Sequence, residues 1–235
     1  MNSTILSAQS ISRKIETQAS TLTILRDVNL EVSAGESIAI QGASGSGKST
    51  LLAILAGLDI PQQGHVFFNN EDITRLDEDQ RAVLRADSVG FVFQSFHLIE
   101  DLTALENIAL PLELFGHTKP FASAKAWLAK LGLANRSSHF PRQLSGGEQQ
   151  RIALCRAFAV EPSLLFADEP TANLDTDTSK AVSKQLFDMQ RGSGTAMVIA
   201  THDHTLAAQC DRIYQLQGGV LINSDALQGA YDEQS

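Results

Sequence analysis

The first part of the chain alternates apolar and polar positions with a period of two, which is typical of half-buried β-strands. The segments ILSAQSI (5–11) and TILRDVNLEV (23–32) show this pattern, and Ala34-Gly35-Glu36 then forms a predicted turn. SIAIQG (37–42) is a short apolar strand that leads into glycines, and VGFVFQ (89–94) is another. PQQGHVFFNNEDI (61–73) predicts a turn followed by a hairpin with Asn69-Asn70 at its tip.

Helical periodicity begins at residue 51. LLAILAGL (51–58) has the length of a short helix, and Gly57 is the predicted stop. From about residue 95 to residue 158 the pattern is mainly helical, in the segments TALENIALPLELFG, SAKAWLAKLGL and GGEQQRIALCRAFAV. The remainder alternates strand and helix patterns, in the order SLLFAD, TSKAVSKQLFDMQ, TAMVIAT, HTLAAQC, RIYQLQ.

Strands separated by helices predict crossover connections and a parallel sheet. We therefore predict an α/β core with a helical insert over about residues 95–158 and an antiparallel flap near the front. Ligands of such sheets bind at the carboxyl ends of the strands. SIAIQG, VGFVFQ, LLFADE and VIATHD all end in polar residues, so that edge is the predicted site.

Composition narrows the function classes. The 235 residues carry a formal net charge of −9, which disfavours nucleic acid as the main partner. The sequence shows no apolar run long enough to cross a bilayer and no secretory signal, so a cytoplasmic protein is expected. Cys155 and Cys210 suggest buried apolar positions in a reducing compartment rather than a disulfide framework or metal cluster.

The segment GASGSGKST predicts a phosphate site, because it matches G-x-x-x-x-G-K-[ST] between a predicted strand and a predicted helix. Glycines allow the backbone N–H groups to point inward at a phosphate, and the helix adds its positive N-terminal end. Lys48 is expected to reach the β- and γ-phosphates, Ser49 to hold Mg²⁺, and Thr50 to contact the next phosphate. The candidate ATP-binding residues here are Gly42, Ala43, Ser44, Gly45, Ser46, Gly47, Lys48, Ser49 and Thr50.

Two adjacent carboxylates end the apolar run of LLFADEP. Asp168 is predicted to hold Mg²⁺, directly or through water. Glu169 is expected to project from the opposite side of an extended backbone, where it would orient or deprotonate the water that attacks the γ-phosphate. Without a phosphate loop upstream, two surface acids after a strand would be an equally good interpretation.

The segment LSGGEQQR (144–151) specifies a family. Together with GASGSGKST, LLFADE and THD (201–203), it resembles the ATP-binding subunit of an ABC transporter over nearly the whole chain. The resemblance implies a P-loop NTPase fold, with one nucleotide-binding domain over 1–235. A RecA-like core and an antiparallel β region would surround a helical subdomain that carries the signature motif.

The resemblance also implies site residues. Gln94 matches the Q-loop glutamine that meets Mg²⁺ or the attacking water, and His202 matches the H-loop histidine at the γ-phosphate. Either residue taken alone would more simply be a satisfied polar group at a strand end. The implied catalytic set is therefore Lys48, Gln94, Glu169 and His202, and the implied metal set is Ser49, Gln94 and Asp168.

The signature motif forms a second anion site, because Ser145, Gly146 and Gly147 precede a predicted helix. In the family this motif closes over the γ-phosphate held by a second subunit, so that two ATP molecules join a head-to-tail homodimer. Asn173, Leu174 and Asp175 match the D-loop, which crosses that dimer interface, and Asp175 joins the implied ATP-contacting residues.

The first strand region departs from the family pattern. An aromatic residue usually stacks on adenine there, but SISRKIETQAS (10–20) has none, and Ile15 is the nearest match. We expect apolar contact alone to hold the base, with weak discrimination between ATP and GTP.

The resemblance implies a membrane-spanning permease partner whose cytoplasmic helices dock beside the Q-loop. Phe96, Leu98, Ile99 and Leu102 are candidate contacts, and the alternative is that they form the core of the helical insert. The chain would then be peripheral on the cytoplasmic face of the inner membrane.

The amino-acid sequences of the motifs most resemble those of the lipoprotein-release and macrolide-export branch, and within it those of YbbA-like proteins. Members of that branch pair with permeases that have few spans and a large extracytoplasmic domain. Three hypotheses follow: an ATPase that powers export or extraction of a lipid or other hydrophobic substrate, a mechanical regulator of an extracytoplasmic hydrolase, or a soluble ABC ATPase without a membrane partner. We favour the first.

Overall fold

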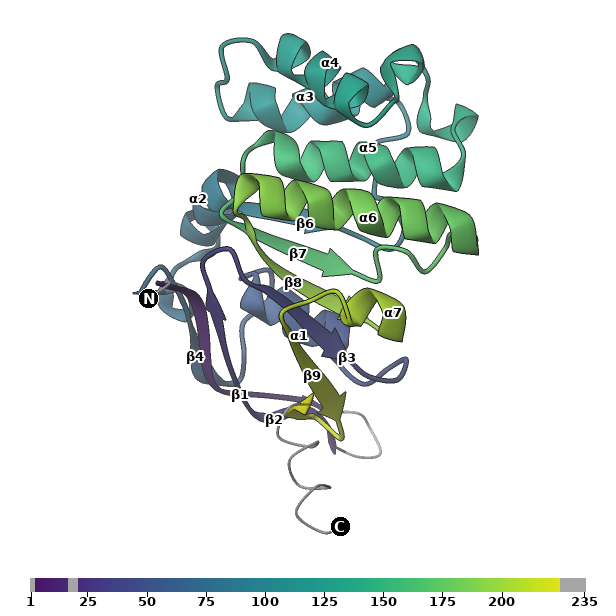
Figure 1. The fold of residues 1–235 in the computed structure, drawn as a ribbon. Helices are drawn as coiled ribbons and strands as arrows, with labels where there is room; N and C mark the ends of the chain where they lie inside the picture. Colours follow the sequence, from purple (N-terminus) through teal and green to yellow (C-terminus); the bar gives the residue numbers. More distant parts are fainter. Residues whose placement is uncertain (1–2, 17–20, 225–235) are drawn as a thin grey trace. The chain divides into compact units, whose positions relative to one another are not determined.

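The computed structural model describes residues 3–16 and 21–224, and it divides the chain into two units. Unit 1 comprises 1–85 and 196–235, and unit 2 comprises 86–195. Each unit is described by itself below, and Figure 1 labels most of their helices and strands. The predicted insert, 95–158, lies within unit 2, which also holds two strands and a long helix outside that range.

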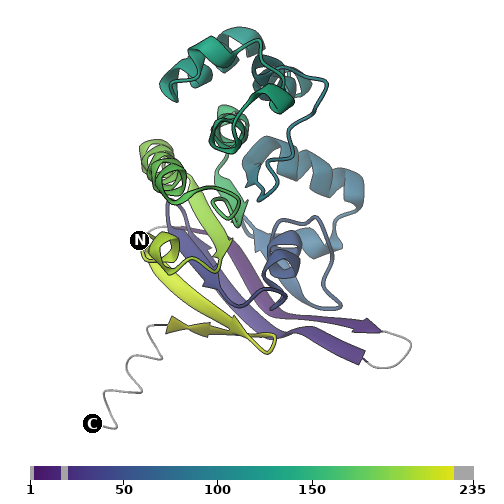
Figure 2. The same ribbon diagram turned by 90° about the vertical axis from the view of Figure 1, so that its right-hand side faces the viewer.

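Unit 1 contains a four-stranded antiparallel sheet in the order β2-β1-β4-β5. β1 and β2 run side by side as long strands (Figure 2), with Leu6 facing Val32 and Ile11 facing Val28 in the register. The predicted hairpin tip is confirmed, since Asn69 and Asn70 both have positive φ, at 49° and 67°. The strands are β1 (Thr4–Glu16), β2 (Thr21–Ser33), β4 (Gln63–Phe68) and β5 (Glu71–Asp72).

The second sheet of unit 1 has the order β10-β9-β3-β8. The central strand β3 pairs in parallel with β8 on one side and β9 on the other, which confirms the predicted parallel sheet. Ile38, Ala39 and Ile40 are fully buried, as expected for a strand covered on both faces. The strands are β3 (Ser37–Gln41), β8 (Ala196–Thr201), β9 (Arg212–Gln217) and β10 (Val220–Asn223).

Helix α1 (Lys48–Leu55) ends as the sequence predicts. Gly57 has a φ of +67°, its N–H donates to the carbonyl of Ile54 at 3.0 Å, and the N–H of Leu58 donates to Ala53 at 2.8 Å. This pair of hydrogen bonds is a Schellman motif, which needs a residue that tolerates the left-handed conformation. The other described helices of unit 1 are η1 (Ile73–Arg75), α2 (Glu78–Ser88, which continues into unit 2) and α7 (His204–Ala207).

Unit 2 pairs two parallel strands, β6 (Val89–Val92) and β7 (Leu164–Asp168). Its helices appear where the sequence pattern is helical, and Thr103 and Ser145 each begin a helix with a capping box. Ile108, Leu112 and Leu128 are fully buried in this unit. The helices are α3 (Ala104–Leu114), α4 (Pro120–Lys130), η2 (Ala134–Arg136), η3 (Pro141–Gln143), α5 (Gly146–Ala159) and α6 (Thr176–Ser193).

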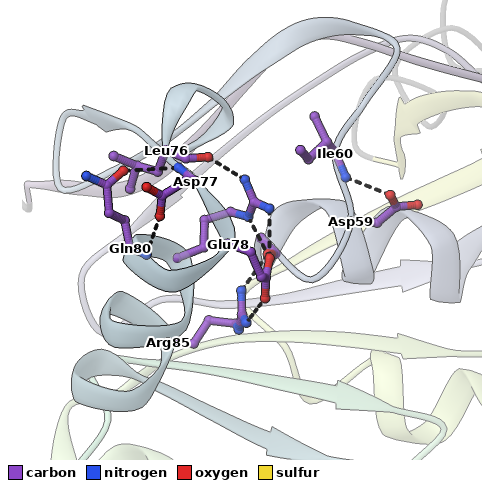
Figure 3. Close-up of polar contacts among 9 residues, drawn as sticks. Asp59, Ile60, Leu76, Asp77, Glu78, Gln80 and Arg85 are labelled. Atoms are coloured by element: carbon purple, nitrogen blue, oxygen red, sulfur yellow. Dashed lines mark hydrogen bonds and ion pairs between the residues drawn. The ribbon is translucent and has the colours of Figure 1, made fainter.

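The sequence analysis did not anticipate α2, because its segment EDQRAVLRADS is strongly polar and has few apolar residues. Polar contacts specify the helix instead (Figure 3). Asp77 and Gln80 exchange side-chain-to-backbone hydrogen bonds at its start, at 2.9 and 3.0 Å. Glu78 accepts from Arg81 at 2.7 Å and from Arg85 at 2.5 Å, and Arg85 also donates to the carbonyl of Gly57 at 2.6 Å.

Arg81 is the buried member of this cluster, with 8% exposure, and its guanidinium also donates to the carbonyl of Leu76 at 2.5 Å. We predict that Arg81→Met lowers stability by about 1–3 kcal/mol, because the carboxylate of Glu78 and the carbonyl of Leu76 lose a charged hydrogen-bond donor. Arg75→Met is the control, since the Arg75 side chain is 77% exposed. Urea midpoints of both variants test this, and equal midpoints would contradict it.

Candidate functional site

The phosphate-loop segment, 42–47, connects β3 to α1, as predicted. Gly45 and Gly47 have φ values of +77° and +100°, so the loop uses backbone conformations that other residues rarely adopt. Lys48 is buried, and its Nζ donates to the carbonyls of Gly42 at 2.9 Å and Ala43 at 3.2 Å. The loop therefore encloses an ammonium group next to the first N–H groups of a helix, which is the arrangement of an anion site.

Gly42 begins this loop in a crowded position. A Cβ there would lie 2.6 Å from Oγ of Ser46 and 2.7 Å from the carbonyl oxygen of Leu216 on β9. A side chain at this position would require the backbone to move. The base of the loop is thus fixed against the neighbouring strand.

His202 follows β8, the neighbour of β3, so His202 and the phosphate loop both follow the carboxyl ends of adjacent parallel strands. The turn beyond His202 is closed by Asp203, whose N–H donates to Oγ1 of Thr201 at 3.0 Å. The Asp203 carboxylate caps α7 by accepting from the N–H groups of Thr205 and Leu206 at 2.7 and 3.3 Å. Burial opposes ionisation of Asp203, but the hydrogen bonds from the Thr205 hydroxyl and from these N–H groups outweigh it and lower the pKa of Asp203.

In unit 2, β7 ends at Asp168, and one buried oxygen of that carboxylate, Oδ1, has no hydrogen-bond partner among the described residues. The extended geometry predicted for Glu169 is wrong, because its φ is +45°, in the left-handed region. The chain turns at Glu169, and the N–H of Ala172 donates to its carbonyl at 3.2 Å. Such a conformation in a non-glycine residue costs on the order of 1–3 kcal/mol and is concentrated at functional sites.

Gln94, from the segment after β6, contacts the predicted D-loop. Its Nε2 lies 3.5 Å from Oδ1 of Asn173, and Nδ2 of Asn173 donates to the carbonyl of Gln94 at 3.1 Å.

Asp175 caps α6 by accepting from the N–H groups of Asp177 and Thr178, and a side-chain hydrogen bond from Thr178 lowers the pKa of Asp175.

Ser145 caps α5. Its Oγ accepts from the N–H of Glu148 at 3.3 Å, and the Glu148 carboxylate accepts from the N–H of Ser145 at 2.9 Å. Nε of Arg136 donates to Glu148 at 2.7 Å, and this hydrogen bond is the main reason that the pKa of Glu148 is lowered. The glutamate of LSGGE therefore holds the start of the signature helix through local hydrogen bonds.

The signature glycines contact the rest of unit 2 closely. A Cβ on Gly146 would lie 3.4 Å from Leu174 of the D-loop and 3.7 Å from Phe96 of the Q-loop segment. A Cβ on Gly147 would lie 2.3 Å from Cγ2 of Thr178 on α6. Unit 2 thus gathers the candidate residues of the Q-loop, the signature and the D-loop around the N-terminus of α5.

The sequence analysis missed two residues of α5 that organise this region. Arg156 donates to the carbonyls of His97 at 2.6 Å and Phe96 at 2.9 Å, and burial lowers its pKa. Phe96 and His97 both have positive φ, at 61° and 47°, so the guanidinium holds a turn that the local sequence does not favour. Gln150 donates to the carbonyl of Pro170, just after Glu169, at 2.6 Å.

The groups present fit Mg²⁺. The described residues contain no cluster of three His, Cys, Asp or Glu side chains that could hold a metal ion by themselves. Mg²⁺ in nucleotide sites instead uses one or two protein oxygens together with phosphates and water. The buried, unpartnered Oδ1 of Asp168 is a donor of that kind.

The remaining candidate positions are at the surface or partly buried. Ile15 is 48% exposed on β1, opposite Leu22, and residues 17–20 of the predicted adenine region lie outside the described residues. Ile99 is 43% exposed and is not part of the core of the helical segment. Cys155 is buried as predicted, Cys210 is half-buried, and burial raises the pKa of both thiols to about 12.

Comparison with known proteins identifies the family. The family model described as ABC transporter matches residues 25–172. The chain belongs to the ABC transporter family. It is 54% identical over 202 residues to the ABC transporter ATP-binding protein YbbA of Escherichia coli K12, covering 85% of this chain and 89% of that protein. It is also 43% identical over 223 residues to the lipoprotein-releasing system ATP-binding protein LolD of Hahella chejuensis, covering 94% and 96%.

A solved structure of the ABC transporter cassette MJ0796, described as dimeric and bacterial, has a TM-score of 0.86 and 36% sequence identity to this chain, covering 92% of it. A second, described as a dimeric post-hydrolysis state of the ATP-binding cassette MJ0796 with ADP and Pi, has a TM-score of 0.85. The predicted P-loop NTPase fold and the predicted ABC ATPase activity class are thereby confirmed. The roles of individual site residues stay predictions.

The contact between Gly147 and Thr178 gives a stability test of the signature motif. We predict that Gly147→Ala destabilises the ABC ATPase by about 1–3 kcal/mol, because the added methyl group overlaps Cγ2 of Thr178. Adding Thr178→Ser, which removes Cγ2 and keeps the hydroxyl for Asp175, should restore most of the loss. Urea unfolding of the two single variants and the double variant measures this, and purely additive effects would refute the steric cause.

Proposed function

We propose that this chain is the ATP-hydrolysing subunit of a membrane complex, which dimerises on ATP and drives a permease to export or extract a lipid or other hydrophobic substrate. One observation carries the ATP-dependent dimerisation in this proposal: the chain presents two glycine-led helix N-termini, at α1 in unit 1 and at α5 in unit 2. Each can hold an anion. A single nucleoside triphosphate needs only one phosphate loop. The N-terminus of α5 can therefore bind the nucleotide held by another subunit.

The proposed chemistry requires little covalent work from the protein. Lys48 and the N–H groups of the phosphate loop neutralise charge on the transferred phosphoryl group, and His202 contributes at the γ-phosphate. Mg²⁺, held by Ser49, Asp168 and Gln94, would supply further positive charge. Glu169 positions the attacking water or accepts its proton.

The head-to-tail dimer follows from the signature. Ser145, Gly146 and Gly147 of one subunit would close over the γ-phosphate bound by the other, with Asp175 at the interface. The dimeric structures of the MJ0796 cassette support this arrangement. ATP then favours the closed dimer and hydrolysis releases it, which gives a ligand-driven two-state switch.

A membrane partner is proposed because the family works on membranes and the described helices include none long and apolar enough to span one. The docking surface we assign to it follows Gln94 and contains Ile99, which is exposed, and Phe96, Leu98 and Leu102, which are half-buried. Arg156 fixes the backbone of this surface at residues 96 and 97. The subunit would then lie on the cytoplasmic face of the inner membrane.

The likeness to LolD, named for a lipoprotein-releasing system, supports extraction of a lipidated or hydrophobic substrate. We propose that the permease has few spans and a large extracytoplasmic domain, through which force is transmitted. A mechanical regulator of an extracytoplasmic hydrolase would use the same ATPase and the same type of partner.

Substitutions at Lys48 and Glu169 should affect different steps, ATP binding at Lys48 and ATP turnover at Glu169. We predict that Glu169→Gln keeps ATP affinity within about threefold, lowers kcat at least about 100-fold and elutes as a dimer with MgATP. Lys48→Ala should lose ATP affinity at least about tenfold, because the ammonium contacts the phosphates, and should stay monomeric. Equilibrium binding, phosphate release and size-exclusion chromatography test this. Equal loss of affinity in both variants would refute the division of roles.

The function is tested by capture of the partner. Tagged Glu169→Gln protein, incubated with ATP and detergent-solubilised membranes, should retain a membrane protein with few spans and a large outer domain. Lys48→Ala under the same conditions is the control and should retain much less. Retention of a soluble protein alone, or of nothing, would favour the third hypothesis and contradict the proposed membrane role.

A further inference from the structure

Gln41 is the last residue of β3 and immediately precedes the phosphate loop. In the parallel register it lies beside Thr201 of β8 and Gln215 of β9. It is only 4% exposed, in a strand whose three preceding residues are fully buried. A buried amide is costly unless both its oxygen and its nitrogen are hydrogen-bonded.

Both ends of the Gln41 amide have partners. Its Oε1 accepts from Nε2 of Gln215 at 2.8 Å, and its Nε2 lies 3.0 Å from Nδ1 of His204, the first residue of α7. With the amide so oriented, Gln41 donates to His204, and Nδ1 must be the acceptor. This arrangement corresponds to the imidazole tautomer that carries its proton on Nε2. We call Gln215, Gln41 and His204 the amide–imidazole chain.

The amide–imidazole chain joins the two candidate phosphate-contacting segments of unit 1. At one end, Gly42 follows Gln41 directly, accepts from Lys48 at 2.9 Å and has no space for a side chain against Leu216. At the other end, His204 lies two residues after His202, in the turn closed by Asp203. Because the turn is short and hydrogen-bonded at both ends, fixing His204 also restricts where the backbone of His202 can lie.

We propose that His204 is a positioning residue for ATP hydrolysis, which acts through Gln41 to hold the His202 segment in a fixed position relative to the base of the phosphate loop. The inference rests on the proposed function, since it assumes that both segments contact the phosphates. Nucleotide affinity comes from Lys48 and the phosphate loop, and both stay in place when the amide–imidazole chain is broken. Loss of the amide–imidazole chain therefore lowers kcat and leaves KM for ATP nearly unchanged.

Two near-isosteric variants test the proposal in the full-length protein. An Asn side chain places its oxygen where Nδ1 of histidine lies, whereas Gln extends its amide to the position of Nε2. We expect His204→Gln and Gln41→Leu to lower kcat about tenfold with KM for ATP within about twofold, and His204→Asn to stay within about threefold of wild type. Gln209→Ala, an exposed side chain just beyond α7, is the control and should match wild type.

A spectroscopic readout is independent of activity. The ¹⁵N shifts of the His204 ring, assigned by the signals lost in His204→Asn, should show the Nε2–H tautomer in wild type and a change of tautomer in Gln41→Leu. Equal kcat in His204→Gln and His204→Asn, or an unchanged ring signal in Gln41→Leu, would overturn the inference. Absence of ATP hydrolysis in wild type would overturn the proposed function instead. The ring signals would still report whether the amide–imidazole chain is formed.

Discussion

The parallel pairing of β3 with β8 and β9 is the interaction on which the candidate phosphate site depends. Because β3 is buried on both faces, its residues 38–40 are apolar and its polar side chains lie at its two ends, with Ser37 at the start and Gln41 at the carboxyl end. The phosphate loop, the His202 turn and the amide of Gln41 all lie at that edge. Parallel pairing thus brings together segments that are more than 150 residues apart in the sequence.

In unit 2, a single helix connects candidate segments that are distant in the sequence. α5 is capped by Ser145 and Glu148 at its start, bonded through Gln150 to the backbone after Glu169, and bonded through Arg156 to the Q-loop turn. A movement of this helix would act on three candidate segments together. That property suits the proposed role, in which the state of a nucleotide is converted into a displacement at a membrane partner.

Motifs with a direct backbone consequence were predicted well from the sequence. Gly57, Asn69 and Asn70 adopt the left-handed conformations that their positions indicated, and the phosphate loop lies between the expected strand and helix. Features set by polar contacts distant in sequence were missed. α2 is strongly polar, Glu169 leaves the extended conformation, and neither Gln41 nor Arg156 belongs to a recognisable pattern. Their roles come from partners that only the fold places beside them.

The double use of single side chains has a consequence for genetics. Asp175 belongs to the proposed dimer contact and is also the cap of an 18-residue helix, while Ser145 belongs to the signature and is the cap of α5. An inactive mutant at either position therefore has two possible causes, a lost nucleotide contact or a frayed helix end. Cellular abundance of the mutant protein would separate them, because fraying exposes the chain to proteases whereas a lost contact leaves a full complement of idle subunits.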